Sequence, residues 1–363
     1  MPPVAGHDLL LLDLDGTVYV APEVIPTAPA ALEQARAAGA RLLFLTNNAL
    51  RTPEQTAELL SGLGVPAAAD EVVTSAQAAA GLLAADLPAG SPVLVVGGEG
   101  LRRAVADVGL LPVDEAADGP VAVVQGYAPT VDWALLSEGA LAVRAGARWM
   151  ATNLDLTLPS PRGQLVGNGA LVAAVRAATG VEPEVAGKPE RHLVDAALAR
   201  LAPGTARSAT GPTARSAAAP GGLVVGDRLD TDIACAHRAG LPSLLVLTGV
   251  SRVPELLTAR REERPSLVGR DLSALHVPHP TVLLEEGGSA RCGGWRAQVV
   301  DGRLTVEPVG DAVVAQDDPA GEDGTDGLDP LRAAAVVAWA AADAGRPADL
   351  AGAAARLTEL TGT

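Results

Sequence analysis

Two aspartates that follow one apolar run are the first residues of this chain that could carry chemistry. The run Leu9–Leu12 is followed by Asp13 and Asp15, and then by Gly16 and Thr17. Side chains two positions apart on a strand share a face, so both carboxylates should lie in the crevice at the strand's carboxyl end. Like charges this close repel unless a cation or a proton sits between them. We therefore expect a bound divalent cation at Asp13 and a proton on Asp15.

A second apolar run ends in the polar group Thr46, Asn47 and Asn48, within LLFLTNN. At the carboxyl end of a parallel strand, the Thr46 hydroxyl and the neighbouring amides of Asn47 and Asn48 could hold phosphoryl oxygens. A strand that ends in Thr-Asn is common, so this segment indicates a phosphate site only in combination with the other motifs.

Two further segments carry charges that suit an anionic substrate. Lys188 in AGKPE stands at the start of a predicted helix, although a single lysine is usually a solvated surface charge. Asp227 and Asp232 follow the apolar run in LVVGDRLDTDI, across a turn that lets both meet one ion and its waters. An acidic helix N-terminus, favoured by the helix dipole, would also explain Asp230 and Asp232.

In this order, the four segments resemble the signature motifs of the haloacid-dehalogenase-like phosphatases, over roughly residues 7–275. The resemblance implies that Asp13 is a nucleophile that forms an aspartyl phosphate. Asp15 would protonate the leaving alkoxide and then act as the base for water. The resemblance also implies a Mg²⁺ ion, held by the Asp13 and Asp227 carboxylates and by the Asp15 main-chain carbonyl.

The same resemblance assigns roles to the remaining motif residues. Thr46, Asn47, Asn48 and Lys188 would bind the phosphoryl oxygens as charge develops on them. Asp232 would orient either a water of the ion or Lys188. All of these residues are present in the chain.

The elements that must position these residues alternate along the chain. Short aliphatic runs and Ala- and Leu-rich stretches alternate to about residue 270, and the runs are apolar at successive positions, as in strands covered on both faces. The pattern predicts an α/β fold with a Rossmann-like doubly wound parallel sheet. Thr52 as N-cap, with Pro53 and Gln55, predicts a helix start. The expected strands are 9–12, 42–45, 93–96, 121–124, 223–225 and 244–247.

The spacing of the motifs predicts an inserted domain. The interval from Asp15 to Thr46 fits one strand-and-helix passage, whereas the interval from Thr46 to Lys188 holds a whole domain. The expected domains are a discontinuous core at 1–87 and 181–275 and an inserted α/β cap at 88–180.

The inserted segment resembles the class IIA large-cap branch, which is nitrophenylphosphatase-like and includes phosphoglycolate, pyridoxal phosphate and glycerol 3-phosphate phosphatases. In that branch the cap selects the substrate and often forms a dimer interface. Asn153, Asp155 and Arg162 are the cap residues expected to contact substrate, with turn-forming roles as the alternative. Trp133 and Trp149 are expected in the cap core or at a dimer contact.

Residues 276–363 form an additional C-terminal segment. Its size and place resemble the degenerate Gcn5-type acetyltransferase segment of some bacterial glycerol-3-phosphate-phosphatase-like relatives, and it lacks the pyrophosphate loop of an active acetyltransferase. The segment 203–222, with its repeated TARSA, is expected to be a flexible surface insertion. The C-terminal elements expected are strands near 281–284 and 295–300, a solvated acidic linker at 317–329 and a helix at 330–343.

Composition disfavours several classes of protein. The formal net charge of -16 at pH 7 disfavours a nucleic-acid surface. The N-terminus does not resemble a signal peptide, and no apolar run is long enough to span a bilayer. Cys235 and Cys292 lie far apart and show neither metal nor redox spacing. We expect a cytoplasmic protein that binds neither nucleic acid nor membrane, with Cys235 as a free thiol in the core.

The expected activity is Mg²⁺-dependent hydrolysis of a small phosphate monoester, with glycerol 3-phosphate as the candidate that the resemblance favours. The alternatives are 2-phosphoglycolate, pyridoxal phosphate and sugar phosphates, and the remote alternative is a catalytically silent binding protein. A phosphomutase is disfavoured because its cap would usually precede Thr46. The expected partners are a small phosphorylated metabolite and a second copy of the chain, bound through the cap.

Overall fold

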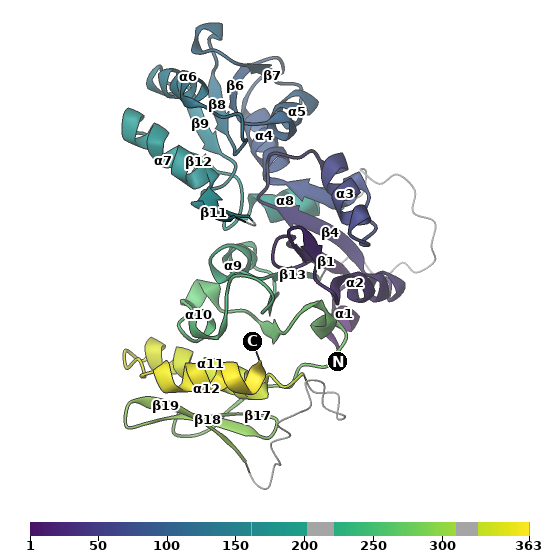
Figure 1. The fold of residues 1–363 in the computed structure, drawn as a ribbon, viewed down its shortest axis with the longest axis vertical. Coiled ribbons are helices and arrows are strands. Elements are labelled where there is room, and N and C mark those ends of the chain that lie inside the picture. Colours follow the sequence, from purple (N-terminus) through teal and green to yellow (C-terminus); the bar gives the residue numbers. More distant parts are fainter. Residues whose placement is uncertain (161, 202–220, 310–325, 363) are drawn as a thin grey trace. The chain divides into compact units, whose positions relative to one another are not determined.

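The computed structural model describes residues 1–160, 162–201, 221–309 and 326–362. Contacts divide the chain into two units: the first combines Met1–Leu42 with Ala217–Thr363, and the second is Leu43–Ser216 (Figure 1). The TARSA repeat lies outside the described residues, as does most of the acidic run 317–329. No helix within the described ranges is both long and apolar enough to cross a membrane.

The first unit contains four parallel strands in the order β15-β14-β13-β1. All four residues of β1 are fully buried leucines, and Leu9 pairs with Gly222 at the start of β13. Strands with no exposed face need apolar residues at every position, which is why their runs do not alternate. The bounds are β1 (Leu9–Leu12), β13 (Gly222–Gly226), β14 (Ser243–Val246), β15 (Leu267–Gly269), α1 (Pro3–Gly6), α2 (Ala28–Ala37), α9 (Ala234–Ala239) and α10 (Val253–Leu257).

The second unit begins within β4 (Arg41–Thr46), which pairs in parallel with β5 (Val72–Thr74). After β4 the chain enters α3 (Pro53–Gly62), where the capping box between Thr52 and Gln55 predicted from the sequence is confirmed. The other helices beside these strands are α4 (Ser75–Asp86) and α8 (His192–Ala199).

A five-stranded parallel sheet in the order β12-β9-β8-β6-β7 forms the rest of the second unit. Helices α6 and α7 pack on one face around Trp149, and α4 and α5 pack on the other. Trp149 is therefore a core residue as predicted, whereas Trp133 is 82% exposed. The bounds are β6 (Pro92–Val96), β7 (Leu111–Val113), β8 (Ala122–Gln125), β9 (Arg148–Ala151), β12 (Glu184–Val185), α5 (Glu99–Asp107), α6 (Trp133–Arg144), α7 (Asn168–Thr179) and the hairpin β10 (Thr157–Ser160) with β11 (Gly163–Val166).

The C-terminal segment folds into an antiparallel sheet, β16-β17-β18-β19, covered by α11. Apolar residues from this sheet and from α11 and α12 share one core with β14, α10 and β15 of the first unit. The predicted strand at 295–300 and the predicted helix at 330–343 are confirmed, whereas the strand expected near 281–284 is limited to Leu283–Leu284. The bounds are β16 (Leu283–Leu284), β17 (Ala290–Cys292), β18 (Trp295–Val300), β19 (Arg303–Pro308), α11 (Asp329–Asp343) and α12 (Ala351–Thr361).

The expectation of a solvated acidic linker is wrong at the end of the acidic run. Asp329 is buried, and Arg332 donates hydrogen bonds to Asp326 at 2.7 Å and to Asp329 at 3.1 Å. The same guanidinium donates to the main-chain oxygen of Val268 at 2.7 Å. These carboxylates are buried because a buried arginine neutralises them, which composition alone does not reveal.

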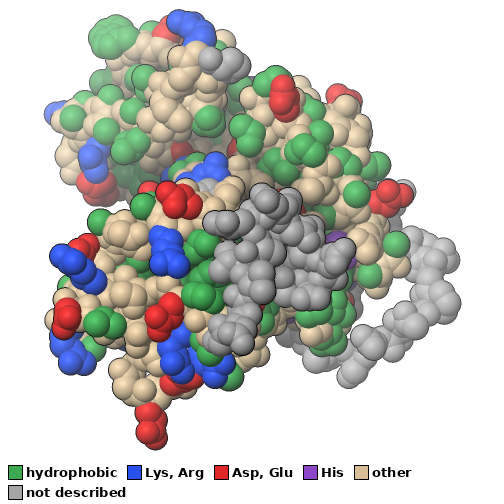
Figure 2. All heavy atoms as spheres, turned by 60° about the horizontal axis from the view of Figure 1, so that its bottom comes forward, with side chains coloured by type: hydrophobic (Ala, Val, Ile, Leu, Met, Phe, Trp, Pro, Cys, Tyr) green, Lys and Arg blue, Asp and Glu red, His purple; other side chains and the backbone are tan. Residues whose placement is uncertain are grey.

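The charges on the described surface are mixed in sign. Figure 2 shows acidic and basic side chains interspersed on one face of the molecule, with small hydrophobic areas between them. A nucleic-acid surface instead gathers Lys and Arg into a patch or stripe. On the face drawn there, the described residues form no such stripe.

Candidate active site

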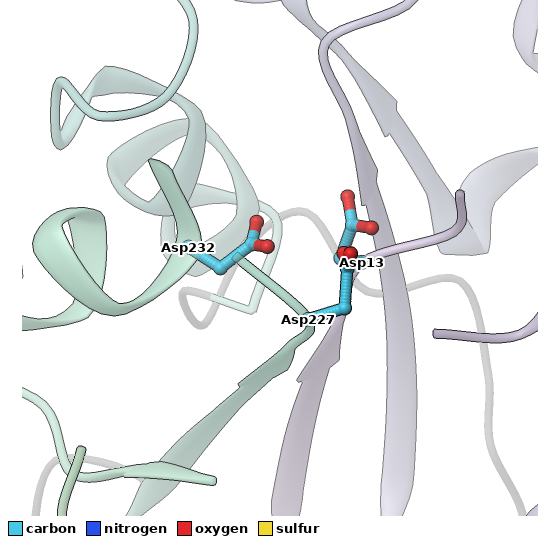
Figure 3. A group of neighbouring side chains, drawn as sticks. All are labelled: Asp13, Asp227 and Asp232. Carbon is cyan, nitrogen blue, oxygen red and sulfur yellow. The ribbon is translucent and has the colours of Figure 1, made fainter. Parts of the chain in front are cut away.

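Three aspartates of the first unit converge at the carboxyl ends of its strands. Asp13 follows β1, Asp227 follows the neighbouring strand β13, and Asp232 lies in the helical turn Leu229–Ile233. One carboxylate oxygen from each lies within 4.8 Å of those of the other two. Figure 3 shows the Asp13 and Asp227 side chains on adjacent strand ends, with the Asp232 carboxylate directed toward them. The parallel register of β1 and β13 is what brings residues so distant in sequence together.

Backbone groups and close packing fix the two buried members of this cluster. Asp227 is fully buried and accepts a hydrogen bond from the Val250 N–H at 2.6 Å. Asp232 is 1% exposed and accepts one from the Arg228 N–H at 3.1 Å. Gly249 lies so close that a Cβ there would overlap the Asp227 carboxylate. Both carboxylates are therefore held in fixed positions.

Asp15 lies beside this cluster, with an exposed side chain. The Tyr19 hydroxyl donates to its carboxylate at 3.3 Å, and Asp15 forms an isolated backbone bridge with Tyr19. The next residue, Gly16, has φ = 88° and faces the Asp227 carboxylate, so both its conformation and its surroundings require glycine. The Thr248 hydroxyl donates to the Gly16 carbonyl at 2.5 Å, which braces this turn.

The donor set of the first unit fits a divalent cation with hard oxygen ligands. Three carboxylates that converge at this spacing repel one another unless a cation neutralises them, and Mg²⁺ and Ca²⁺ both take carboxylate oxygens. Burial acts to raise the pKa of nearby Asp230, but hydrogen bonds from Arg228 outweigh it and hold that pKa below its usual range. Asp13, Asp227 and Asp232 are therefore a group of carboxylates that could hold the ion. The roles expected from the sequence, with the Asp15 main-chain carbonyl as a ligand and Asp232 orienting a water or Lys188, stay predictions.

Thr46 ends β4 in the second unit and is buried. Its hydroxyl oxygen accepts a hydrogen bond from the Asn48 N–H at 3.0 Å. The Asn48 side chain accepts from the Leu50 N–H at 2.9 Å and thereby closes the turn that leads to α3. The turn thus presents a hydroxyl and backbone amides at the end of a parallel strand.

Lys188 of the second unit is buried rather than solvated, with 4% of its surface exposed. Its ammonium group donates to the Leu45 main-chain oxygen at 3.3 Å, so the side chain reaches the end of β4. The helix predicted at Lys188 begins only at His192. A buried ammonium at a strand end is a cation placed for an anionic ligand.

The structure separates the three cap residues predicted to contact substrate. Asn153 is buried, donates to the Asn47 carbonyl at 2.8 Å and accepts from the Asp155 N–H at 3.2 Å. Asp155 accepts from the Asn47 side chain at 3.2 Å. Arg162 is exposed in the turn between β10 and β11, apart from the other two. Asn153 and Asp155 therefore have turn-forming and bridging contacts, and substrate contact by any of the three stays a prediction.

Sequence reasoning missed the loop after β14. Three residues of this loop contact the turns around the carboxylate cluster. The Thr248 hydroxyl donates to the Gly16 carbonyl, and Gly249 packs against the Asp227 side chain. The Ser251 hydroxyl oxygen accepts a hydrogen bond from the Leu229 N–H. The available signal was a cluster of small residues directly after an apolar run, at the position where a parallel strand opens into the crevice.

Comparison with known proteins agrees with this geometry. Residues 10–111 match the family described as haloacid dehalogenase-like hydrolase, and residues 185–275 match one described as HAD-hydrolase-like. Residues 292–361 match a GCN5-related N-acetyltransferase-like domain. D-glycerol 3-phosphate phosphatase of Mycobacterium tuberculosis is 46% identical over 95% of this chain and 88% of its own length.

Solved structures give the same relationship over nearly the whole chain. Glycerol phosphate phosphatase Rv1692 from Mycobacterium tuberculosis, in complex with magnesium, is 43% identical, with a TM-score of 0.81 and 99% of both chains covered. The 4-nitrophenylphosphatase of Thermotoga maritima is 28% identical, with a TM-score of 0.66, over 76% of this chain and 98% of its own. The chain thus belongs to the haloacid dehalogenase-like hydrolases, in the class IIA nitrophenylphosphatase-like branch, with a GCN5-related C-terminal extension.

Proposed function

We propose that this protein is a Mg²⁺-dependent phosphatase that hydrolyses glycerol 3-phosphate to glycerol and inorganic phosphate. The observation that carries the proposal is the convergence of the Asp13, Asp227 and Asp232 carboxylates at adjacent strand ends. The relative of 46% identity supports the substrate, because that relative is a D-glycerol 3-phosphate phosphatase. The magnesium complex of Rv1692 supports the choice of ion.

The proposed reaction divides into two displacements at phosphorus. An Asp13 carboxylate oxygen attacks the phosphorus atom, and the bond to the glycerol oxygen breaks as Asp15 gives that oxygen a proton. Asp15 then takes a proton from a water that attacks the same phosphorus, which releases phosphate and restores Asp13. A Mg²⁺ ion held by the carboxylate cluster would supply charge neutralisation for this reaction.

The second unit supplies groups suited to the phosphoryl oxygens. We assign the Thr46 hydroxyl, the Asn47 backbone amide and the Lys188 ammonium to this task. The Asn48 N–H, the fourth group expected from the sequence, instead donates to the Thr46 hydroxyl oxygen and orients it. Fixed donors of this kind stabilise charge where it develops, without reorganisation during the reaction. The burial of Thr46 and Lys188 supports the assignment, since donors act more strongly away from water.

A homodimer formed through the cap belongs to the same proposal. Leu156 and Val166, on and beside the β10–β11 hairpin, are 66% and 59% exposed, and Leu154 and Leu165 are exposed beside them. Such exposed apolar groups favour burial against a second surface. Sedimentation equilibrium should give a dimer for the parent protein and a monomer for the L156D/V166D variant; a monomeric parent would refute this part.

A cytoplasmic location is also part of the proposal. Its support is that Cys235 and Cys292 are both buried and neither forms a disulfide, a cysteine usage typical of a reducing compartment. Fractionation of the source cells should place the enzyme with the cytoplasmic markers, and recovery with secreted proteins would oppose it.

The test of the main proposal combines a substrate panel with one variant. Glycerol 3-phosphate should give the highest kcat/KM in a panel that includes 2-phosphoglycolate, pyridoxal phosphate and hexose phosphates. Chelation of Mg²⁺ should abolish phosphate release, and so should Asp13→Asn, because an amide cannot serve as the anionic nucleophile. Turnover by Asp13→Asn near the parent rate would sink the mechanism, whereas another winning substrate would overturn only the choice of ester.

A further inference from the structure

We propose that the Asn47 side chain is a positioning residue that holds Lys188 in place for phosphate and ties that placement to the cap loop. The inference rests on the proposed function, which assigns the Lys188 ammonium to the phosphoryl group, and it goes further by giving the Asn47 amide side chain a task of its own. All the residues involved belong to the second unit and so to one compact body.

The Asn47 amide group makes a two-way clamp on the Lys188 backbone. Its Oδ1 accepts a hydrogen bond from the Lys188 N–H at 2.8 Å, and its Nδ2 donates to the Lys188 carbonyl at 3.1 Å. A planar amide that pairs with both backbone groups of one residue fixes the position and the orientation of that residue. The Lys188 side chain then leaves a fixed point and reaches the Leu45 carbonyl at the end of β4.

The residue before Lys188 shows how tightly this clamp is packed. A Cβ on Gly187 would stand 2.5 Å from Asn47 Oδ1 and would also meet the Thr152 carbonyl. Gly187 therefore has to be glycine because the Thr152 carbonyl and the Asn47 amide both approach closely, and its φ does not lie in the left-handed region.

Asn47 also joins the clamp to the cap loop at 153–155. Its Nδ2 donates to Asp155 at 3.2 Å, and its own carbonyl accepts from Asn153 Nδ2 at 2.8 Å. The Asn153 carbonyl in turn accepts from Asn168 at the start of α7, at 2.8 Å. A chain of amide hydrogen bonds therefore runs from the cap helix through Asn47 to Lys188, and a shift of the cap loop would move the clamp.

A double-mutant cycle in the full chain tests whether Asn47 acts through Lys188. The four proteins are the parent, Asn47→Ala, Lys188→Met and the double variant, and p-nitrophenyl phosphate is the substrate, so that the outcome does not depend on the physiological ester. Asn47→Ala should lower kcat/KM on the order of 10²-fold in the parent, the scale expected when a catalytic group shifts by about 1 Å. In the Lys188→Met background the same change should cost less than about 2-fold, because residues that act as a unit are not additive.

The same double-mutant cycle can be measured without turnover, from the dissociation constant of orthovanadate for each of the four proteins in the presence of Mg²⁺. This binding measurement decides whether Asn47 acts through Lys188 if the turnover of Lys188→Met is too slow to measure. Asn47→Asp is the second variant in case Asn47→Ala does not fold, because it keeps the acceptor for the Lys188 N–H and removes the donor to the Lys188 carbonyl. Its loss, which includes repulsion between the new carboxylate and Asp155, should also vanish in the Lys188→Met background.

Gln55→Ala is the matched control. It removes another amide side chain of the second unit, one that is exposed and caps α3 through the Thr52 N–H. Its kcat/KM should stay within about 2-fold of the parent in both backgrounds, as expected for a surface cap. The inference would be overturned if Asn47→Ala lowered kcat/KM by the same factor in the parent and in the Lys188→Met background. It would also be overturned if Asn47→Ala left the kcat/KM of the parent unchanged. Activity of Asp13→Asn, by contrast, would overturn the proposed function.

Discussion

Replacement of Gly249 by alanine should damage the carboxylate cluster without unfolding the protein. Gly249 lies in the loop after β14, and its φ is not in the left-handed region, so only space forbids a side chain. A Cβ at this position would overlap the Asp227 carboxylate and stand 2.6 Å from the Asp227 Cβ. Ordinary contacts begin at 3.4 Å, so the two residues must separate by roughly 1 Å.

The size of the effect follows from what Asp227 does in its present position. A shift of about 1 Å breaks the 2.6 Å hydrogen bond from the Val250 N–H, a bond to a charged group worth about 1.5–3 kcal/mol. The shift also moves one of the three carboxylates away from the other two. We expect kcat to fall on the order of 10²-fold, the usual cost of misplacement by this distance, and the Mg²⁺ requirement to rise by at least about 10-fold.

The assay is a Mg²⁺ titration of phosphate release, together with urea unfolding. Gly352→Ala is the matched control, because Gly352 lies in α12 of the same unit with open space around it. That variant should keep the parent kcat and the parent Mg²⁺ dependence. Parent-like values for Gly249→Ala would refute the view that this loop holds Asp227 in place.

Two further predictions concern the C-terminal segment. Arg332→Leu should lower the free energy of unfolding by about 3–5 kcal/mol in urea denaturation, because it leaves the Asp326 and Asp329 carboxylates without their cation. The control is Arg303→Leu, which removes an exposed arginine and should cost less than about 1 kcal/mol. Equal losses for the two variants would contradict this prediction. Burial lowers the pKa of His279, and the positive charge of Arg332 lowers it further. As pH drops below about 6.5, the unfolded chain therefore takes up a proton on this histidine before the folded chain does, and the free energy of unfolding should fall. His279→Gln should flatten this pH dependence, and an unchanged slope would contradict the prediction.

The parallel core and its carboxylates could be predicted from sequence because their signals are local. Leu9–Leu12 is apolar at every position and ends directly at Asp13, and the run before Asp227 has the same form, so the carboxyl ends of two buried strands were visible without any contact information. The predicted α/β parallel fold is confirmed. The role of each site residue stays a prediction.

The features that sequence did not reveal depend on contacts between distant segments. Nothing in the local sequence indicates that Thr248 contacts Gly16 near the N-terminus or that Gly249 packs against Asp227. The burial of Asp329 depends on Arg332, one helical turn later in α11. Arg332 is held in turn by the Val268 carbonyl in β15. The clamp of Asn47 on Lys188 joins residues separated by more than a hundred positions, and an asparagine in a turn carries no mark of such a distant partner.

The pairing of β1 with β13 has a consequence for the synthesis of the chain on the ribosome. The partner of Leu9 is Gly222, so the N-terminal strand leaves the exit tunnel long before the residues that cover it exist. At about 5–20 residues per second, the delay is on the order of 10–40 s. During that interval the four consecutive leucines of β1 lack β13, their partner strand on one side. The nascent chain should therefore bind hydrophobic-specific chaperones at its N-terminus, and release should coincide with the emergence of β13.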